Sequence, residues 1–177
     1  ITVDETIVLA EGKTAVLDLN GKTISHNDEA NQYAINNHGT LTIKDSNGNG
    51  SINARGIYNG YGNGGDNTAT ATIIVESGTI NAKGTNGGAA IFNYGVAEIK
   101  GGTFTSIGGY SLNNQQGSSM VVSAGVTANN GIYASGATLT VDGGQISGNR
   151  SGCHVVYCWN TTATFNGGEF YNNNSGN

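Results

Sequence analysis

The chain has 177 residues, of which 30 are glycine, none is proline and 11% are charged, and its formal net charge is -5. Its seven basic residues are scattered along the sequence, so they cannot form the positive surface that a nucleic-acid backbone requires. No apolar run approaches the roughly 18 residues that a membrane-spanning helix needs. The sequence therefore argues against a nucleic-acid partner and against a membrane span.

A short phrase recurs along the sequence: a small residue, an aliphatic residue, an aromatic residue or Asn, and usually a second Asn. An alternating segment such as Thr40–Ile43 follows most copies, and a glycine turn with a third short segment, such as Gly101–Phe104, comes next. Period-two alternation predicts half-buried strands, and no segment has helical spacing. Three strands and three turns in roughly 20 to 24 residues are typical of one coil of a β-solenoid.

The repeat predicts an all-β solenoid of about seven coils, each with three short strands, in which stacking of the coils creates the core. In chain order the expected coils are 6–24, 34–52, 56–75, 90–104, 111–126, 131–146 and 155–170. We expect residues 1–177 to form one domain. Because the chain begins without a methionine or a signal-like segment, we also expect it to be a segment or the mature part of a longer secreted protein.

The phrase also assigns side chains to the inside and the outside of the coils. If its aliphatic residue points inward, the residue two places later also points inward. This places Asn37, Asn59, Asn93 and Asn114 in a structural asparagine ladder, which ends where Ala134 and Cys158 take the same place. Corner glycines with positive φ are expected at Gly78, Gly102, Gly125, Gly144 and Gly168.

Aromatic residues gather at the outward positions of the same phrase. Flat rings in a row on a rigid sheet suit stacking against sugar faces or burial against a protein partner. Alternatively, the rings cover the sheet or pack under the long segments 27–33 and 60–67. The candidate ligand-binding face consists of Tyr58, Phe92, Tyr94, Tyr133, Tyr157 and Trp159.

Catalysis on this scaffold requires carboxylates that converge on one outer face, about 5 to 9.5 Å apart for glycoside hydrolysis. The outward row of the second strand holds Asp18 and Glu98, which lie three coils apart, about 14 Å at strand spacing. Glu76 is expected to form an exposed ion pair with Lys100. We therefore expect no catalytic residue, no metal, no cofactor and no enzymatic activity.

The two cysteines, Cys153 and Cys158, lie close together in the sequence. A disulfide between them requires a bend, because an extended path separates their Cα atoms by about 16 Å. With His154 they supply too few ligands for zinc. The sequence leaves the disulfide open.

Gly87–Gly95, read with the strand Thr40–Ile43 and the segment Phe170–Asn173, resembles a repeat of bacterial surface proteins in which GGA-I-Y-N precedes a turn and a T-L-T-I strand. The resemblance covers essentially the whole chain. It implies a right-handed parallel β-helix of the pectate-lyase-like superfold. Families built this way include autotransporter-type adhesins, chlamydial polymorphic membrane proteins, phage tailspikes and polysaccharide lyases.

These observations lead us to expect an extracellular adhesive or structural module that presents its aromatic outer face to a glycan or a surface protein. One alternative is a polysaccharide-degrading lyase or hydrolase of the same superfold. Another is a self-assembling filament or phage tail-fibre subunit, because open β-helix ends expose strand edges through which copies can associate.

Overall fold

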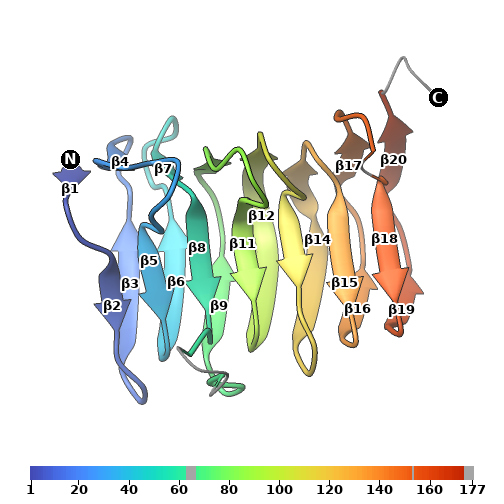
Figure 1. The fold of residues 1–177 in the computed structure, drawn as a ribbon, viewed down its shortest axis with the longest axis horizontal. Helices are drawn as coiled ribbons and strands as arrows, with labels where there is room; N and C mark the ends of the chain where they lie inside the picture. Colours follow the sequence, from blue (N-terminus) through green and yellow to red (C-terminus); the bar gives the residue numbers. More distant parts are fainter. Residues whose placement is uncertain (63–66, 153, 174–177) are drawn as a thin grey trace.

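The computed structural model describes residues 1–62, 67–152 and 154–173. Twenty strands wind into a solenoid of about seven coils, and no helix occurs in these three ranges. Figure 1 shows the coils side by side along the long axis, with the first strand, β1 (Thr2–Val3), and the last strand, β20 (Glu169–Asn172), at opposite ends. The pairings within the two sheets are parallel, from β2 (Ile7–Leu9) with β5 (Ile35–Asn37) to β15 (Ile132–Ser135) with β18 (Val156–Trp159). The prediction of an all-β solenoid is confirmed.

One side of every coil contributes a strand to a seven-stranded sheet, which lies at the front of Figure 1. The strands of this sheet carry the recurring phrase, so that Ile57 lies beside Ile35 and Ile91. Its members are β2 (Ile7–Leu9), β5 (Ile35–Asn37), β8 (Gly56–Asn59), β11 (Ala89–Asn93), β13 (Leu112–Asn114), β15 (Ile132–Ser135) and β18 (Val156–Trp159).

The other two sides of the coils belong to a 13-stranded sheet. They join because two long strands, β12 (Val96–Ser106) and β14 (Ser119–Ala128), run through the corner between them. One side also contains β3 (Thr14–Asp18), β6 (Thr40–Lys44), β9 (Thr72–Val75), β16 (Thr138–Val141) and β19 (Thr162–Phe165). The other also contains β1 (Thr2–Val3), β4 (Thr23–His26), β7 (Ser51–Ala54), β10 (Thr79–Ala82), β17 (Gln145–Gly148) and β20 (Glu169–Asn172).

The core consists of aliphatic rows that run along the rod, one residue per coil. Ile57, Ile73 and Ile52 are fully buried and come from the three sides of the solenoid. Each fully buried side chain of this size contributes about 2 kcal/mol of transfer free energy. A residue in such a row is buried by the equivalent residues of the coils on both sides. Phe165 and Phe170 face inward on the seventh coil, which has a described neighbouring coil on one side, and they are 50% and 42% exposed.

The corner glycines follow the prediction at four of five positions. Gly78, Gly102, Gly144 and Gly168 have φ between 96° and 111°. The prediction for Gly125 is wrong, because Gly125 pairs with Gly101 rather than Gly102. A Cβ at Gly125 would lie 2.9 Å from the Lys100 carbonyl oxygen, so close packing of the corner explains this glycine.

Candidate functional site

The four ladder asparagines lie inside the solenoid, along one corner beside the seven-stranded sheet, and all are fully buried. The Asn37 amide donates to Asn59 Oδ1, Asn59 donates to Asn93 Oδ1, and Asn93 donates to Asn114 Oδ1, each at 2.7 Å. The sequence therefore places one amide per coil at the strand spacing, where each side chain satisfies the next.

Each ladder amide also donates a hydrogen bond to at least one backbone carbonyl, in its own coil or in the next coil. Asn59 donates to the carbonyls of Ala71 and Val96 at 3.2 and 2.9 Å. At the far end, Asn114 donates to the Thr138 carbonyl at 2.9 Å, and Ser118 donates to Asn114 Oδ1 at 2.6 Å. The ladder joins strands to corners and is a structural element. The next coils hold Ala134 and Cys158 in its place.

The first aromatic cluster consists of Tyr33, Tyr58, Tyr61, Phe92 and Tyr94. Tyr58 on β8 lies between Tyr33 and Tyr61, with ring centroids 3.7 and 4.4 Å away in stacked arrangements. Phe92 lies 5.4 Å from Tyr58, and Tyr94 lies 5.2 Å from Tyr61. Both faces of the Tyr58 ring are therefore occupied by rings of the protein itself.

This packing changes the acidity of the phenols. Burial raises the pKa of Tyr33 and Tyr58 above 10, and burial together with the neighbouring Tyr58 and Tyr61 raises the pKa of Tyr94 to about 12. The Arg55 guanidinium lies over Tyr33, 5.6 Å from the ring centroid, and donates to the Asn86 carbonyl at 3.0 Å. The first cluster behaves as a small external core.

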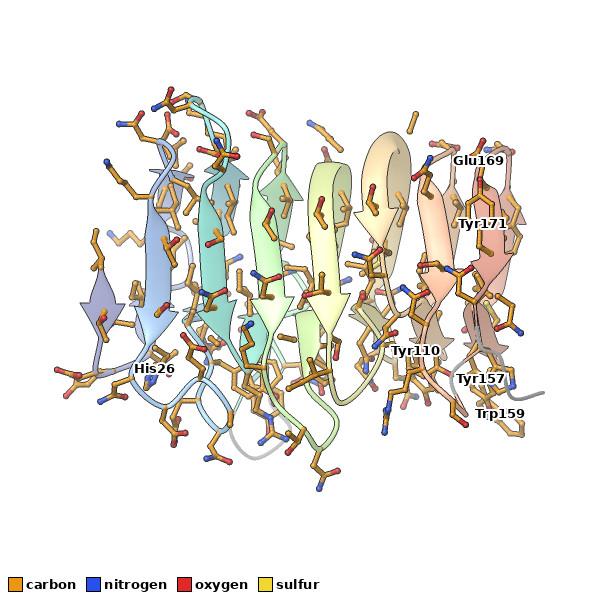
Figure 2. The ribbon with its side chains drawn as sticks, turned by 90° about the horizontal axis from the view of Figure 1, so that it is seen from above. His26, Tyr110, Tyr157, Trp159, Glu169 and Tyr171 are labelled. Atoms are coloured by element: carbon orange, nitrogen blue, oxygen red, sulfur yellow. The ribbon has the colours of Figure 1, made fainter. Side chains whose placement is uncertain are left out.

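The second aromatic cluster consists of Tyr110, Tyr133, Tyr157 and Trp159. Tyr133 on β15 and Tyr157 on β18 stack with centroids 5.3 Å apart and planes only 6° from parallel. Tyr110 lies 5.5 Å from Tyr133. Trp159, two residues after Tyr157 on the same strand, is 65% exposed. Figure 2 shows Tyr110, Tyr157 and Trp159 together at the C-terminal coils.

The six candidate aromatic residues do not form one continuous face. Strand register places Asn113 between Phe92 and Tyr133, so the row of rings is interrupted in the fifth coil. A second outward row lies two residues further along each coil. It holds Gln115 in the fifth coil, Ser135 in the sixth and Trp159 in the seventh, and Ser135 pairs directly with Trp159. Tyr58, Phe92 and Tyr94 thus belong to the first cluster, whereas Tyr133, Tyr157 and Trp159 belong to the second.

Tyr33 and Tyr61 come from segments 27–33 and 60–67, and their contacts with Tyr58 agree with the alternative that outward rings pack under these segments. Tyr110 was not predicted, because it lies in a connecting segment outside the repeated phrase. His154 was missed for the same reason: its ring lies 5.2 Å from that of Tyr157, and its Nδ1 lies 3.3 Å from the Tyr110 hydroxyl. The available signal was the presence of aromatic residues and a histidine in the segments that precede β5, β13 and β18 and in the segment that follows β8.

Two predictions about charged residues were wrong. Asp18 pairs with Lys44, at 3.7 Å between their charged atoms, and Val16 takes the outward row position expected for Asp18. Lys100 lies 3.1 Å from Glu98 on its own strand, which replaces the expected pairing with Glu76. A hydrogen bond from the Ser46 backbone amide is the main cause that lowers the pKa of Asp18.

Two carboxylates that the sequence argument did not bring together border one shallow hollow at the corner after β16 and β19. Asp142 and Glu169 both line it. The Asn166 amide donates to Asp142 at 2.7 Å, and the Tyr171 hydroxyl donates to Glu169 at 2.7 Å. Both carboxylates are thus already hydrogen-bonded by neighbouring side chains, and the hollow lies open to solvent.

Within the described ranges, no group of three or more His, Cys, Asp or Glu side chains is placed to hold a metal ion. In the same ranges, no helix has the length and apolarity needed to cross a membrane.

Cys158 is exposed. The question of a Cys153–Cys158 disulfide lies outside the described residues, because Cys153 is not among them.

Comparison with models of protein families, with curated proteins and with solved structures finds no match for this chain. The fold is therefore assigned from the structure itself as a parallel β-solenoid of about seven coils.

Proposed function

We propose that this chain is an extracellular adhesive or structural module, a stiff β-solenoid that presents the second aromatic cluster to a glycan or a protein partner. The observation that carries the proposal is the exposure of Trp159, at 65%, beside the stacked pair Tyr133 and Tyr157. An exposed indole next to ordered rings offers a flat apolar surface on a rigid sheet, which suits stacking against a sugar or an apolar partner side chain.

The solenoid supports this role because it holds the rings in place. Tyr133 and Tyr157 are directly paired residues on adjacent strands. Each of them follows an inward-facing residue, Ile132 or Val156, which is also paired with the other. Side chains fixed by a packed backbone lose little further freedom when a ligand binds, which favours affinity. The expectation of an extracellular location rests on the resemblance of Gly87–Gly95 to a repeat of bacterial surface proteins.

The proposal is tested with a broad glycan array, on which the intact chain is compared with a double variant, Tyr133→Ala with Trp159→Ala. A matched control, Thr140→Ala with Thr164→Ala, changes two outward residues on another side of the solenoid. We expect the intact chain and the control to bind and the double variant to lose binding. An intact chain that binds no glycan, or a double variant that binds normally, would overturn a glycan site here.

A filament or tail-fibre subunit is the second candidate function, because coils that pair through parallel strands can pair in the same way with the coils of another copy. Strand pairing is a general route by which sheets associate. Sedimentation velocity over a range of concentrations tests this alternative. Growth of assemblies that Phe170→Glu abolishes would support it, whereas a monomer at every concentration would argue against it.

A further inference from the structure

We infer that the ligand of the second aromatic cluster is an uncharged, extended glycan that lies along the solenoid axis across the fifth, sixth and seventh coils. This inference rests on the proposed glycan-binding function and narrows it to a chemical class and an orientation. The surface involved comprises two outward rows of three residues each, which are Asn113, Tyr133 and Tyr157 in one row and Gln115, Ser135 and Trp159 in the other.

The ligand class follows from charge. None of these six side chains carries a charge near neutral pH, and the whole chain has a net charge of -5. Recognition of a carboxylated or sulfated sugar normally uses Arg or Lys in charge-assisted hydrogen bonds. At the edge of the surface, Arg150 donates to the Gly108 carbonyl at 2.8 Å, and His154 lies against Tyr157. Glu169 lies toward the other side of the last coil (Figure 2).

The polar groups in the two rows suit sugar hydroxyls. Gln115 donates its amide to Asn113 Oδ1, which leaves Gln115 Oε1 as an acceptor and the Asn113 amide as a donor toward a ligand. Ser135 adds a hydroxyl directly beside Trp159. An aromatic platform with a few fixed amide and hydroxyl groups provides both the apolar and the polar contacts that a neutral pyranose needs.

The orientation follows from strand spacing. Three adjacent strands span about 10 Å along the rod, and alternate residues of one strand lie about 7 Å apart across it. The surface is therefore longer along the axis than across it. Three successive coils give positions for successive sugar rings: Trp159 offers an exposed ring face, and the first row offers the Asn113 amide and then the outward edges and hydroxyls of Tyr133 and Tyr157, whose faces are turned toward each other.

The first aromatic cluster does not offer a comparable surface. Tyr33 and Tyr61 cover both faces of Tyr58, and the second row holds Tyr94 against Tyr61. A sugar ring would have to displace a ring of the protein. Of the two clusters, the second therefore has the more accessible ring, because Trp159 is mainly solvent-exposed.

The test is isothermal titration calorimetry of the intact chain with cello-, xylo- and manno-oligosaccharides of increasing length, and with oligogalacturonates as anionic counterparts. Titrations at about 0.05 M and about 0.5 M NaCl separate charged from uncharged recognition, because salt screens exposed charges. We expect at least one uncharged series to bind, with a Kd that changes less than about twofold with salt. We also expect roughly tenfold tighter binding from the monosaccharide to the trisaccharide, followed by a plateau.

Variants locate the site. Trp159→Ala is expected to weaken binding by more than roughly tenfold, and Gln115→Ala by several-fold, whereas the Thr140→Ala control is unchanged. Preferred, salt-sensitive binding of oligogalacturonates would overturn the uncharged class while the glycan-binding function stands. Equal affinity for all lengths would overturn the axial orientation. Binding of none of these sugars in any form would contradict the inference, and only an empty glycan array would also overturn the proposed glycan-binding function.

Discussion

The two aromatic clusters occupy the same rows of the same sheet, yet they differ in what lies behind and in front of the rings. Behind the first cluster, Asn59 and Asn93 belong to the buried ladder, and in front of it Tyr33 and Tyr61 cover Tyr58. Behind the second cluster stand Ala134 and Cys158. In front of it no described ring covers Trp159, which is largely exposed.

This difference shows that one repeated phrase can serve two purposes. Where a connecting segment supplies further rings, the outward aromatic residue becomes part of a small external core and contributes to stability. Where it does not, as at Trp159, the ring stays available to a ligand. We therefore expect stability to depend on the first cluster and binding to depend on the second.

The largest expected effect on stability comes from interrupting the asparagine ladder beneath the first cluster. Asn59→Ala should lower the free energy of unfolding by about 3 kcal/mol, because it leaves the Asn93 and Asn37 amide groups without one partner each inside the core. Urea unfolding followed by circular dichroism measures this loss. Asn47→Ala, which removes an asparagine side chain at an exposed turn position, is the control and should change stability by less than about 0.5 kcal/mol. Equal losses for the two variants would contradict the ladder's role.

Tyr58→Ala should lower the free energy of unfolding by about 2 kcal/mol, because the ring stacks against Tyr33 and Tyr61 and packs beside Phe92. Urea unfolding again provides the measurement, and the glycan array should show that the variant retains binding. A Tyr58→Ala protein that is fully stable but no longer binds would reverse the roles assigned to the two clusters.

Alkaline pH should weaken the first cluster. The pKa of Tyr94 is raised to about 12 by burial and by the adjacent tyrosines, so above pH 10 the unfolded chain releases its proton before the folded chain does. Stability is therefore fully present below pH 10 and is lost as the pH rises through about 12. The urea midpoint measured from pH 8 to about 12 should fall, and Tyr94→Phe should reduce the fall. A midpoint with the same pH dependence in both proteins would exclude Tyr94 as a cause.

The smallest effect on stability is expected at the second cluster. Trp159→Ala should change the free energy of unfolding by less than about 0.5 kcal/mol, because the indole is 65% exposed. The same urea experiment measures it. A loss as large as that of Tyr58→Ala would mean that Trp159 is a packing residue, and the comparison between the clusters would fail.

Periodicity explains why the sequence predicted so much of the fold. The inward and outward positions of the phrase alternate, and Asn37, Asn59, Asn93 and Asn114 therefore share one row before any coordinate is known. The error at Asp18 has the same origin: Ala15, Leu17 and Leu19 alternate over three places, and a shift of two residues keeps every side chain on its own face. Side-chain pattern alone cannot choose between these registers.

The candidate site was less predictable, because its decisive residues lie partly outside the repeat. Tyr33, Tyr61 and Tyr110 come from connecting segments without a period, so only the folded chain shows which outward rings they contact. The sequence identified Trp159 as outward-facing, but its exposure depends on what the neighbouring segments contribute.

The most direct test uses the only tryptophan of the chain, Trp159, as a reporter. Its fluorescence is recorded while the uncharged oligosaccharide series is titrated, with acrylamide quenching measured before and after saturation. We predict a shift of the emission to shorter wavelength and protection from acrylamide, because a sugar ring covers the exposed indole. A glycan that binds by calorimetry and leaves both signals unchanged would contradict the placement of the site at the second aromatic cluster.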